Sequence, residues 1–200
     1  MGHLIETPRL ALRTLGPEPL RLSLDGDRVG AERSLAARLP PDWPREPQVL
    51  AMRLVQLEQS PEREPWLTRV IELRSENRII GLTGFHGPPG ADALHEWAPD
   101  GVELGYSIDP EWRRRGLAEE ACRGLMAWAS REQGVSRFVL SIAPTNRAST
   151  ALARKLGFAK IGAWHHEVRG IEDVYRLEAP RERLSPPAPE RPARARRDPR

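Results

Sequence analysis

Residues 102–143 contain the feature that most restricts what this chain can fold into. Apolar and polar residues alternate in residues 102–108 (VELGYSI), which predicts a strand. Residues 116–133 carry apolar side chains at helical spacing and end at Gly134, which predicts a helix. A short apolar strand is predicted at residues 138–143. A strand, a crossover helix and a second strand form a parallel pair, so this segment predicts an α/β protein.

The rest of the chain adds elements on both sides of this unit. Residues 67–74 and 78–86 predict a hairpin that turns at residues 75–77. The other predicted elements are a strand at 9–15, helical structure at 17–39 broken near Gly26 and Gly30, a proline-rich connection at 39–47, a helix at 48–59, a loop at 86–99, a helix at 145–156 followed by Gly157, and strands at 159–168 and 172–178. We therefore expect an α/β (α+β) fold with a mixed central sheet of about six to seven strands flanked by helices.

The C-terminal residues differ in composition from the rest of the chain. The formal net charge of all 200 residues is +3. Residues 181–200 hold seven arginines and three acidic residues, a net charge of +4, which leaves −1 for residues 1–180. Because this segment has few apolar side chains to bury, we expect one domain at residues 1–179 and a disordered tail at residues 180–200. The tail is either a solvating extension or an arm for nucleic acid, and we favour the first.

Composition also excludes several classes of protein. No stretch approaches the roughly 18 apolar residues of a membrane span, and the N-terminus lacks the pattern of a signal peptide. The single cysteine, Cys122, excludes an internal disulfide framework, and its place in a predicted helix favours a buried thiol. His165 and His166 are adjacent in a predicted strand and point to opposite faces, which argues against a shared metal. We expect a cytoplasmic protein with no metal and no membrane partner.

An anion-binding turn is predicted where the strand of residues 102–108 leads into the helix at residue 116. The sequence there is WRRRGLAEEA, residues 112–121. A helix N-terminus leaves backbone N–H groups without acceptors and carries partial positive charge, which suits a phosphate. Gly116 has no Cβ, so a phosphate can approach the backbone closely. The candidate phosphate-binding residues are Arg113, Arg114, Arg115, Gly116, Leu117, Ala118 and Glu119.

A second cluster, PTNRASTALARKLGF at residues 144–158, makes the first one specific. Together with ETPRLALR (6–13), IIGLTGF (79–85) and VELGYSIDPEWRRRGLAEEA (102–121), it resembles the GNAT superfamily of acyl-CoA-dependent N-acetyltransferases, and within it the RimJ/RimL-like branch. The resemblance covers most of residues 5–178. It implies the GNAT fold, acetyl-CoA as cosubstrate and a pyrophosphate held by the backbone N–H groups of residues 114–118. It also implies that the pantetheine arm enters where the strand splays from the next one, pairs with backbone near Ser107 and Ile108, and contacts Asn146.

Two positions depart from the family pattern. Glu119 stands where the family often has Thr or Ser, and a carboxylate at Glu119 or Glu120 would repel a pyrophosphate if it pointed toward it. Ala153 stands where many members carry a tyrosine that acts as general acid, although RimJ/RimL-like members commonly lack it. These departures leave open the alternative of a catalytically silent CoA-binding sensor or interaction module.

Acyl transfer to an amine needs a base for the amine and a hydrogen-bond donor for the leaving thiolate. Alternation places Glu103, Gly105 and Ser107 on one face of their strand. Burial among apolar neighbours raises the pKa of a carboxyl group, so Glu103 is the candidate base. Its structural alternatives are a solvated strand residue or a partner for an arginine. By resemblance Ser149 lies near the coenzyme sulfur, whereas Tyr106 is expected in the core.

We therefore expect an enzyme that transfers the acetyl group of acetyl-CoA to a primary amine in a ternary complex. The acceptor is a small molecule or a peptide, and no residue of the sequence identifies it. Asn146 is also placed to cap a helix, and Trp43, next to Pro44, is either a lid or a staple for its loop. A homodimer is compatible with the resemblance, and nucleic acid is not an expected partner.

Overall fold

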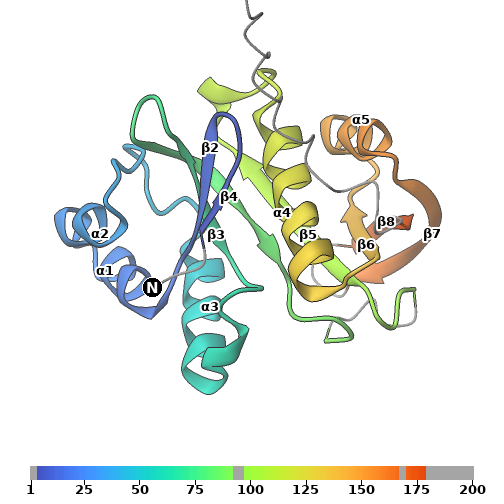
Figure 1. The fold of residues 1–200 in the computed structure, drawn as a ribbon, viewed down its shortest axis with the longest axis horizontal. Coiled ribbons are helices and arrows are strands. Elements are labelled where there is room, and N and C mark those ends of the chain that lie inside the picture. The colour runs from blue at the N-terminus through green and yellow to red at the C-terminus, as the bar shows by residue number, and fades with distance from the viewer. Residues whose placement is uncertain (1–3, 92–96, 167–169, 179–200) are drawn as a thin grey trace, which may run out of the picture.

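A mixed sheet of eight strands organises the computed structural model, which describes residues 4–91, 97–166 and 170–178 (Figure 1). The strand order is β1-β2-β3-β4-β5-β6-β8-β7, and each neighbouring pair is antiparallel except β5 and β6. The strands are β1 (Leu4–Glu6), β2 (Leu10–Thr14), β3 (Arg69–Leu73), β4 (Arg78–Phe85), β5 (Val102–Ile108), β6 (Arg137–Ile142), β7 (Ala159–His166) and β8 (Gly170–Glu178). The helices are α1 (Pro17–Leu24), α2 (Arg28–Leu35), α3 (Pro47–Gln59), α4 (Leu117–Gln133) and α5 (Arg147–Leu156), with short 3₁₀ turns at Pro61–Arg63 and Pro110–Trp112.

The predicted fold is confirmed, including the parallel crossover through α4, but the sheet has one strand more than the seven at most that we expected. The additional strand is β1, which pairs antiparallel with β2 through Leu4–Arg13 and Glu6–Ala11. Only the middle one of its three residues, Ile5, is buried. Three residues are too few for alternation to reveal a strand, so β1 is defined by its pairing rather than by its own sequence.

Helices cover both faces of the sheet (Figure 1). On one face α4 and α5 pack against β-strand residues such as Leu12 and Leu104. The four apolar residues of α4 that were predicted to face the core are all buried: Leu117, Ala121, Leu125 and Trp128. On the other face α1, α2 and α3 form a second core. The neighbouring β3 residues Val70 and Ile71 belong to the two different cores, as strand alternation requires.

The helical region of residues 17–39 divides once, at Gly26, where φ is 77°. The predicted second break at Gly30 is wrong, because Gly30 lies inside α2. Its N–H donates to Asp27 Oδ1 at 2.9 Å, so Asp27 caps the helix that contains it. A side-chain cap of this kind stabilises a helix by about 1 kcal/mol, which offsets the low helix propensity of one glycine.

The proline-rich connection between α2 and α3 is fastened at two points. Trp43 Nε1 donates to Ser23 Oγ of α1 at 2.9 Å, and the indole packs against the core of α1, α2 and α3. Arg45 Nη1 lies 3.0 Å from Asp109 Oδ1, just after β5. Of the two alternatives for Trp43, the structure therefore supports the staple.

The helices of the described ranges include none with the length and hydropathy to cross a membrane. The predicted tail at residues 180–200 lies outside the described residues, as does the end of the predicted strand at Val168. The domain boundary at residue 179 therefore stays a prediction.

Candidate active site

β5 and β6 form a short parallel ladder and then separate. Their pairing consists of Val102 with Phe138 and Glu103 with Val139. The following residues of β5, up to Ile108, pair on the other side with β4. Beyond Glu103 the sheet is therefore open between β5 and β6, where the resemblance places the pantetheine arm.

The hydrogen bonds of β5 decide which backbone groups face this opening. The Glu103 carbonyl accepts from the backbone N–H of His86, which follows β4. The N–H of Asp109 donates to the Ile80 carbonyl of β4. In an antiparallel pair such bonds recur at every second residue, so the backbone of Ser107 is also directed toward β4. The N–H and C=O groups of Tyr106 and the N–H of Ile108 then face the opening, while the Ile108 carbonyl accepts from Arg113 Nε. Ser107, predicted together with Ile108 as a backbone ligand, instead presents its exposed side chain to the neighbouring cavity.

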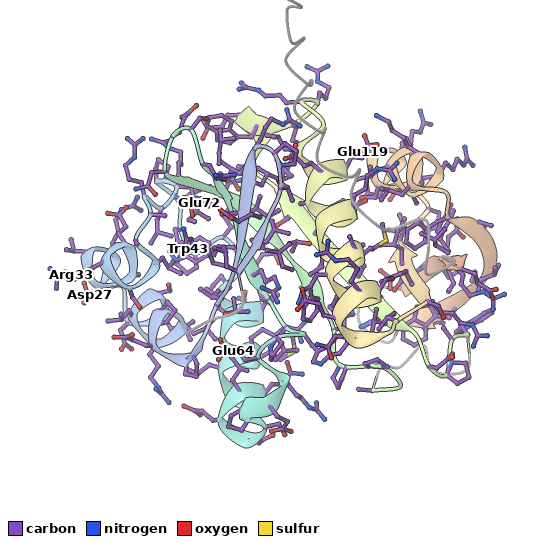
Figure 2. The ribbon with its side chains drawn as sticks, in the orientation of Figure 1. Asp27, Arg33, Trp43, Glu64, Glu72 and Glu119 are labelled. Carbon is purple, nitrogen blue, oxygen red and sulfur yellow. The ribbon has the colours of Figure 1, made fainter. Side chains whose placement is uncertain are left out.

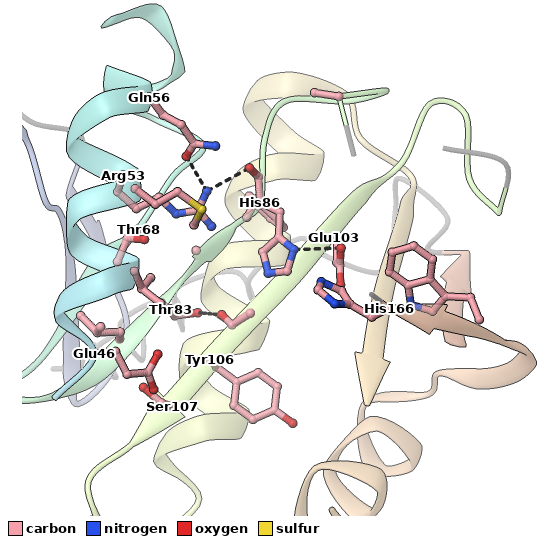
Figure 3. A pocket seen from close by; sticks show the side chains of 18 residues that line it. Glu46, Arg53, Gln56, Thr68, Thr83, His86, Glu103, Tyr106, Ser107 and His166 are labelled. Atoms are coloured by element: carbon pink, nitrogen blue, oxygen red, sulfur yellow. Dashed lines mark hydrogen bonds and ion pairs between the residues drawn. The ribbon is translucent and has the colours of Figure 1, made fainter. Parts of the chain in front are cut away.

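A cavity of about 640 Å³ lies over the open end of β5, on the side of α3 (Figure 3). α3 contributes Met52 and Arg53, and β7 closes the far side with Trp164 and His166. Its volume lies within the range of about 300–1,000 Å³ that is usual for small-molecule sites. The cavity can therefore admit a small amine or the end of a peptide.

Glu103 lines this cavity and is 5% exposed. His86 Nδ1 lies 2.8 Å from Glu103 Oε2, and Ser141 Oγ donates to Oε1. A buried carboxylate requires such donors, because burial without them favours the neutral acid. The solvated alternative for Glu103 is thereby excluded, and its partners include a histidine and a serine.

His86 is the site residue that the sequence analysis missed. It follows β4 directly, lines the cavity, and has a side chain 34% exposed (Figure 3). Its ring lies over Gly105, where a Cβ atom would stand 3.2 Å from Nε2. The pairing of β4 with β5 brings His86 opposite Glu103. The two predicted strands were a signal for this contact, but the long loop between them does not fix their register.

The predicted phosphate turn contains two left-handed residues, Arg114 with φ 60° and Gly116 with φ 76°. Turns of this kind direct backbone N–H groups toward one side and form anion-binding concavities. Glycine adopts this conformation without strain, whereas it is uncommon for a residue with a side chain such as Arg114. α4 begins at Leu117, and its N–H groups at residues 117–119 belong to the first turn, where a helix has no acceptor of its own.

Two of the three arginines of the turn make contacts with the rest of the protein. Arg113 Nε donates to the Ile108 carbonyl at 2.8 Å. The Arg115 guanidinium lies 4.8 Å from the centre of the Trp112 ring, and its Nη2 donates to a backbone carbonyl of the preceding 3₁₀ turn at 3.1 Å. These contacts hold the turn at the end of β5, while the three arginines Arg113, Arg114 and Arg115 all remain exposed.

Glu119 is paired with two cations between α4 and α5 (Figure 2). Its carboxylate lies 2.6 Å from Lys155 Nζ and 3.2 Å from Arg123 Nη2. The hydrogen bond from Lys155 lowers the pKa of Glu119. A carboxylate neutralised in this way does not repel a phosphate as an isolated one would.

Glu120 ties the turn to the loop between β1 and β2. Arg9 Nε donates to Oε2 at 2.6 Å and Thr7 Oγ1 donates to Oε1 at 2.7 Å. Arg9 also donates from Nη1 to the Arg115 carbonyl at 3.0 Å, so one guanidinium joins Glu120 to the phosphate turn. Burial by itself raises the pKa of Glu120, but the hydrogen bonds of Thr7 and Arg9 outweigh burial and lower it.

The start of α5 brings Asn146 and Ser149 together. Asn146 Oδ1 accepts from the Ser149 N–H at 3.1 Å, so the predicted cap is present, and the pantetheine contact stays a prediction. Tyr106 reaches the side of Ser149 from β5. Its ring packs against the α4 core, as predicted, and it also lines the cavity. Burial raises the pKa of Tyr106 to about 12, so the phenol stays protonated at neutral pH.

The remaining candidates are two buried residues of the helices and the histidine pair of β7. Ala153, at the position of the family's tyrosine, is fully buried. Cys122 is also fully buried, as predicted, and burial raises the pKa of its thiol. His166 lines the cavity whereas the adjacent His165 does not, in agreement with their opposite directions. The residues that the structure describes contain no group of three His, Cys, Asp or Glu side chains placed to hold a metal ion.

Comparison by sequence relates this site to known proteins. Residues 9–159 match the family model of the acetyltransferase (GNAT) domain. The chain is 28% identical over 160 residues to the uncharacterized N-acetyltransferase YjdG of Bacillus subtilis, covering 78% of this chain and 89% of that protein. It is 37% identical over 87 residues to the ribosomal protein uS5-alanine N-acetyltransferase of Escherichia coli, covering 44% of this chain and 42% of that protein.

Comparison by structure gives the same fold. The ribosomal-protein-S5-alanine acetyltransferase from Vibrio fischeri has a TM-score of 0.61 and 18% identity, over 92% of this chain and 100% of that chain. RimL, a ribosomal L7/L12 alpha-N-protein acetyltransferase solved in complex with coenzyme A, has a TM-score of 0.60 and 17% identity, over 88% of this chain and 98% of that chain. Identities this low show a shared fold and nothing finer.

Proposed function

Because the chain belongs to the GNAT acetyltransferase family and has RimJ/RimL-like relatives, we propose that it transfers the acetyl group of acetyl-CoA directly to a primary amine in a ternary complex. The observation that carries this proposal is that two openings meet at β5. One is the gap between β5 and β6, and the other is the cavity over Glu103 and His86. A thioester and an amine that enter from the two sides meet without crossing solvent, which supplies proximity and orientation.

For the coenzyme, we assign the pyrophosphate to the N–H groups of residues 114–118, with the charges of Arg113, Arg114 and Arg115 beside it. The left-handed turn at Arg114 and Gly116 supports this fit. The ion pairs of Glu119 and Glu120 support it too, because they neutralise the two carboxylates that would otherwise repel the pyrophosphate. The pantetheine arm lies along the backbone N–H and C=O groups of Tyr106 and the N–H of Ile108, and close to Asn146, whereas the Ile108 carbonyl already accepts from Arg113.

For the chemistry, Glu103 supplies negative charge at the amine end of the site, and Ser149 hydrogen-bonds the leaving sulfur. The buried Tyr106 hydroxyl lies on the side of Ser149 and makes no hydrogen bond within the described residues, so we assign it as a second donor there. Acetyl-CoA brings an already activated carbonyl, so these residues need only to position the reactants, move protons and stabilise charge. The ribosomal-protein relatives support the α-amine of a protein N-terminus as one acceptor class.

Coenzyme binding is tested by isothermal titration of the full chain with acetyl-CoA. Gly116→Ala places a Cβ in the phosphate turn and is expected to weaken binding by at least about tenfold, or 1.4 kcal/mol. Gly134→Ala is the matched control, because Gly134 is also left-handed, with φ 71°, at the far end of the same helix. Both variants lose similar stability, about 1–2 kcal/mol, but only the first loses affinity. Equal affinity in both would refute the assigned phosphate site.

Acetyl transfer is tested by thiol release over a panel of amines that includes polyamines, amino acids, aminoglycosides and a peptide with a free N-terminal alanine. Turnover with one class and not the others identifies the acceptor. Tight binding of acetyl-CoA with no transfer to any amine would instead support the catalytically silent CoA-binding sensor.

A further inference from the structure

His86 and Glu103 form a hydrogen-bonded pair at the floor of the acceptor cavity (Figure 3). His86 is fixed at two points, because its backbone N–H donates to the Glu103 carbonyl at 2.9 Å while the ring nitrogen Nδ1 lies 2.8 Å from Glu103 Oε2. Ser141 holds the other carboxylate oxygen from β6. The pair is therefore supported by three strands, β4, β5 and β6.

The contact defines which ring nitrogen carries the proton. An ionised carboxylate only accepts hydrogen bonds, so Nδ1 must be the protonated nitrogen of the neutral ring. The lone pair of the neutral imidazole is then on Nε2. Nε2 lies on the Gly105 side of the ring, and both His86 and Gly105 line the cavity. The basic atom is thus presented to the space where an amine would bind.

The two residues differ in their access to that space. The Glu103 side chain is 6% exposed, against 34% for His86, and both Glu103 oxygens already accept hydrogen bonds. A general base must reach the proton that it removes. We infer that His86 Nε2, and not Glu103, removes the proton from the acceptor amine, and that Glu103 is a positioning residue that orients the ring and stabilises its charged form. This inference rests on the proposed acetyl transfer.

The proton balance of the step is complete with the groups named. The acceptor enters as an ammonium ion, and one proton passes to His86 Nε2. The freed lone pair attacks the thioester carbonyl, so a C–N bond forms. The C–S bond then breaks, and the second nitrogen proton leaves with the sulfur, which departs as a thiol next to Ser149. The imidazolium returns its proton to water through the cavity, and the products are an amide, coenzyme A and one proton.

Other charged and titratable groups lie around His86 and influence how the protonation of its ring depends on pH. On α3, Arg53 Nη1 lies 3.2 Å from the His86 carbonyl oxygen and also donates to Gln56. His166 lines the cavity from β7, and Glu46 lines it from the start of α3. His166 is the other histidine of this cavity, so the experiment must distinguish it from His86.

The experiment compares His86→Gln, Glu103→Gln and His166→Gln in the full chain, with His165→Gln as the matched control on the opposite face of β7. In the wild type kcat/KM falls toward acid pH as the base becomes protonated. We expect His86→Gln to lower kcat by about 100-fold or more and to abolish this acid limb, with unchanged acetyl-CoA affinity. Glu103→Gln causes a smaller loss and keeps the acid limb. His165→Gln leaves both unchanged.

A second measurement is independent of turnover. Nitrogen NMR of ¹⁵N-histidine-labelled protein reports which ring nitrogen of His86 is protonated, and we expect Nδ1–H in the wild type and a changed signal in Glu103→Gln. An Nε2–H ring overturns the inference. So does an acid limb that only Glu103→Gln or only His166→Gln removes. If the wild type binds acetyl-CoA but acetylates no amine, the proposed function fails by itself, and the NMR signal still decides whether the pair has the inferred tautomer.

Discussion

Two adjacent glutamates at the start of α4, Glu119 and Glu120, carry opposite implications in sequence and in structure. In the sequence they stand at a predicted phosphate site, where their negative charges would repel a bound phosphate. In the structure both are paired: Glu119 with Arg123 of α4 and Lys155 of α5, and Glu120 with Arg9. Arg9 then reaches the carbonyl of Arg115. The negative charge of Glu120 therefore helps to hold the phosphate turn in shape.

Glu120→Gln is expected to destabilise the protein by about 1–3 kcal/mol at pH 7, because a hydrogen-bonded carboxylate is replaced by a neutral amide. The folded-state pKa of Glu120 is lowered from 4.5, so its contribution is present above pH 4.5 and is lost as the pH falls through the lower folded value. Urea unfolding at pH 7 and near pH 3 checks this. A difference between wild type and variant that stays constant with pH would contradict the role of the charge.

At the scale of elements, α5 shows how one residue can serve both fold and site. Asn146 caps the helix through the Ser149 N–H, and by resemblance it also contacts the pantetheine arm. The cap was readable from the sequence, because Asn opens a run with helical spacing and Gly157 closes it. The cap also fixes the backbone position of Ser149.

Asn146→Ala is expected to cost about 1 kcal/mol of stability, because the first turn of α5 loses its side-chain acceptor. Asn146→Asp keeps an acceptor and should retain nearly all of that stability. The two variants separate the roles when thermal unfolding and acetyl-CoA titration are measured together. If affinity is lost in both while stability is lost only in the alanine variant, the amide itself contacts the coenzyme. Unchanged affinity in both would leave Asn146 as a cap alone.

The elements of the fold could be predicted from the sequence, whereas one contact of the candidate site could not. The hairpin of β3 and β4, the crossover through α4 and the burial of its apolar stripe followed from periodicity and turn residues. The contact between His86 and Glu103 did not, because it depends on the register of β4 and β5 across a long loop. Local patterns specify elements, whereas register is settled by pairing that no local window contains. For the same reason Glu103 was identified and its partner was missed.

At the scale of the whole molecule, the basic character of the chain belongs to its C-terminal segment. Residues 1–180 have a formal net charge of −1, and residues 181–200 have +4. β8, which pairs with both β6 and β7, ends at Glu178, and Leu177 packs against the α4 core. The charge and the packed body are therefore separable by a cut after residue 180.

Deletion of residues 181–200 is expected to leave the unfolding free energy and the acetyl-CoA affinity unchanged, because the segment has few apolar side chains and no part in the proposed site. Fluorescence anisotropy with DNA and RNA oligonucleotides at two salt concentrations tests the alternative. Salt-dependent binding that the deletion abolishes would make the segment a nucleic-acid arm. Equal or undetectable binding in both forms agrees with a solvating extension.

The opening between β5 and β6 has a consequence for how this protein tolerates change. In the proposed complex the groups that meet the coenzyme there are the peptide N–H and C=O of Tyr106 and the N–H of Ile108, which every residue except proline supplies. An alanine scan of β5 would therefore miss this part of the affinity. The gap between β5 and β6 is open to an extended ligand that pairs with the backbone as a further strand would. Substitution of side chains leaves these backbone groups in place, so it does not remove this part of the recognition.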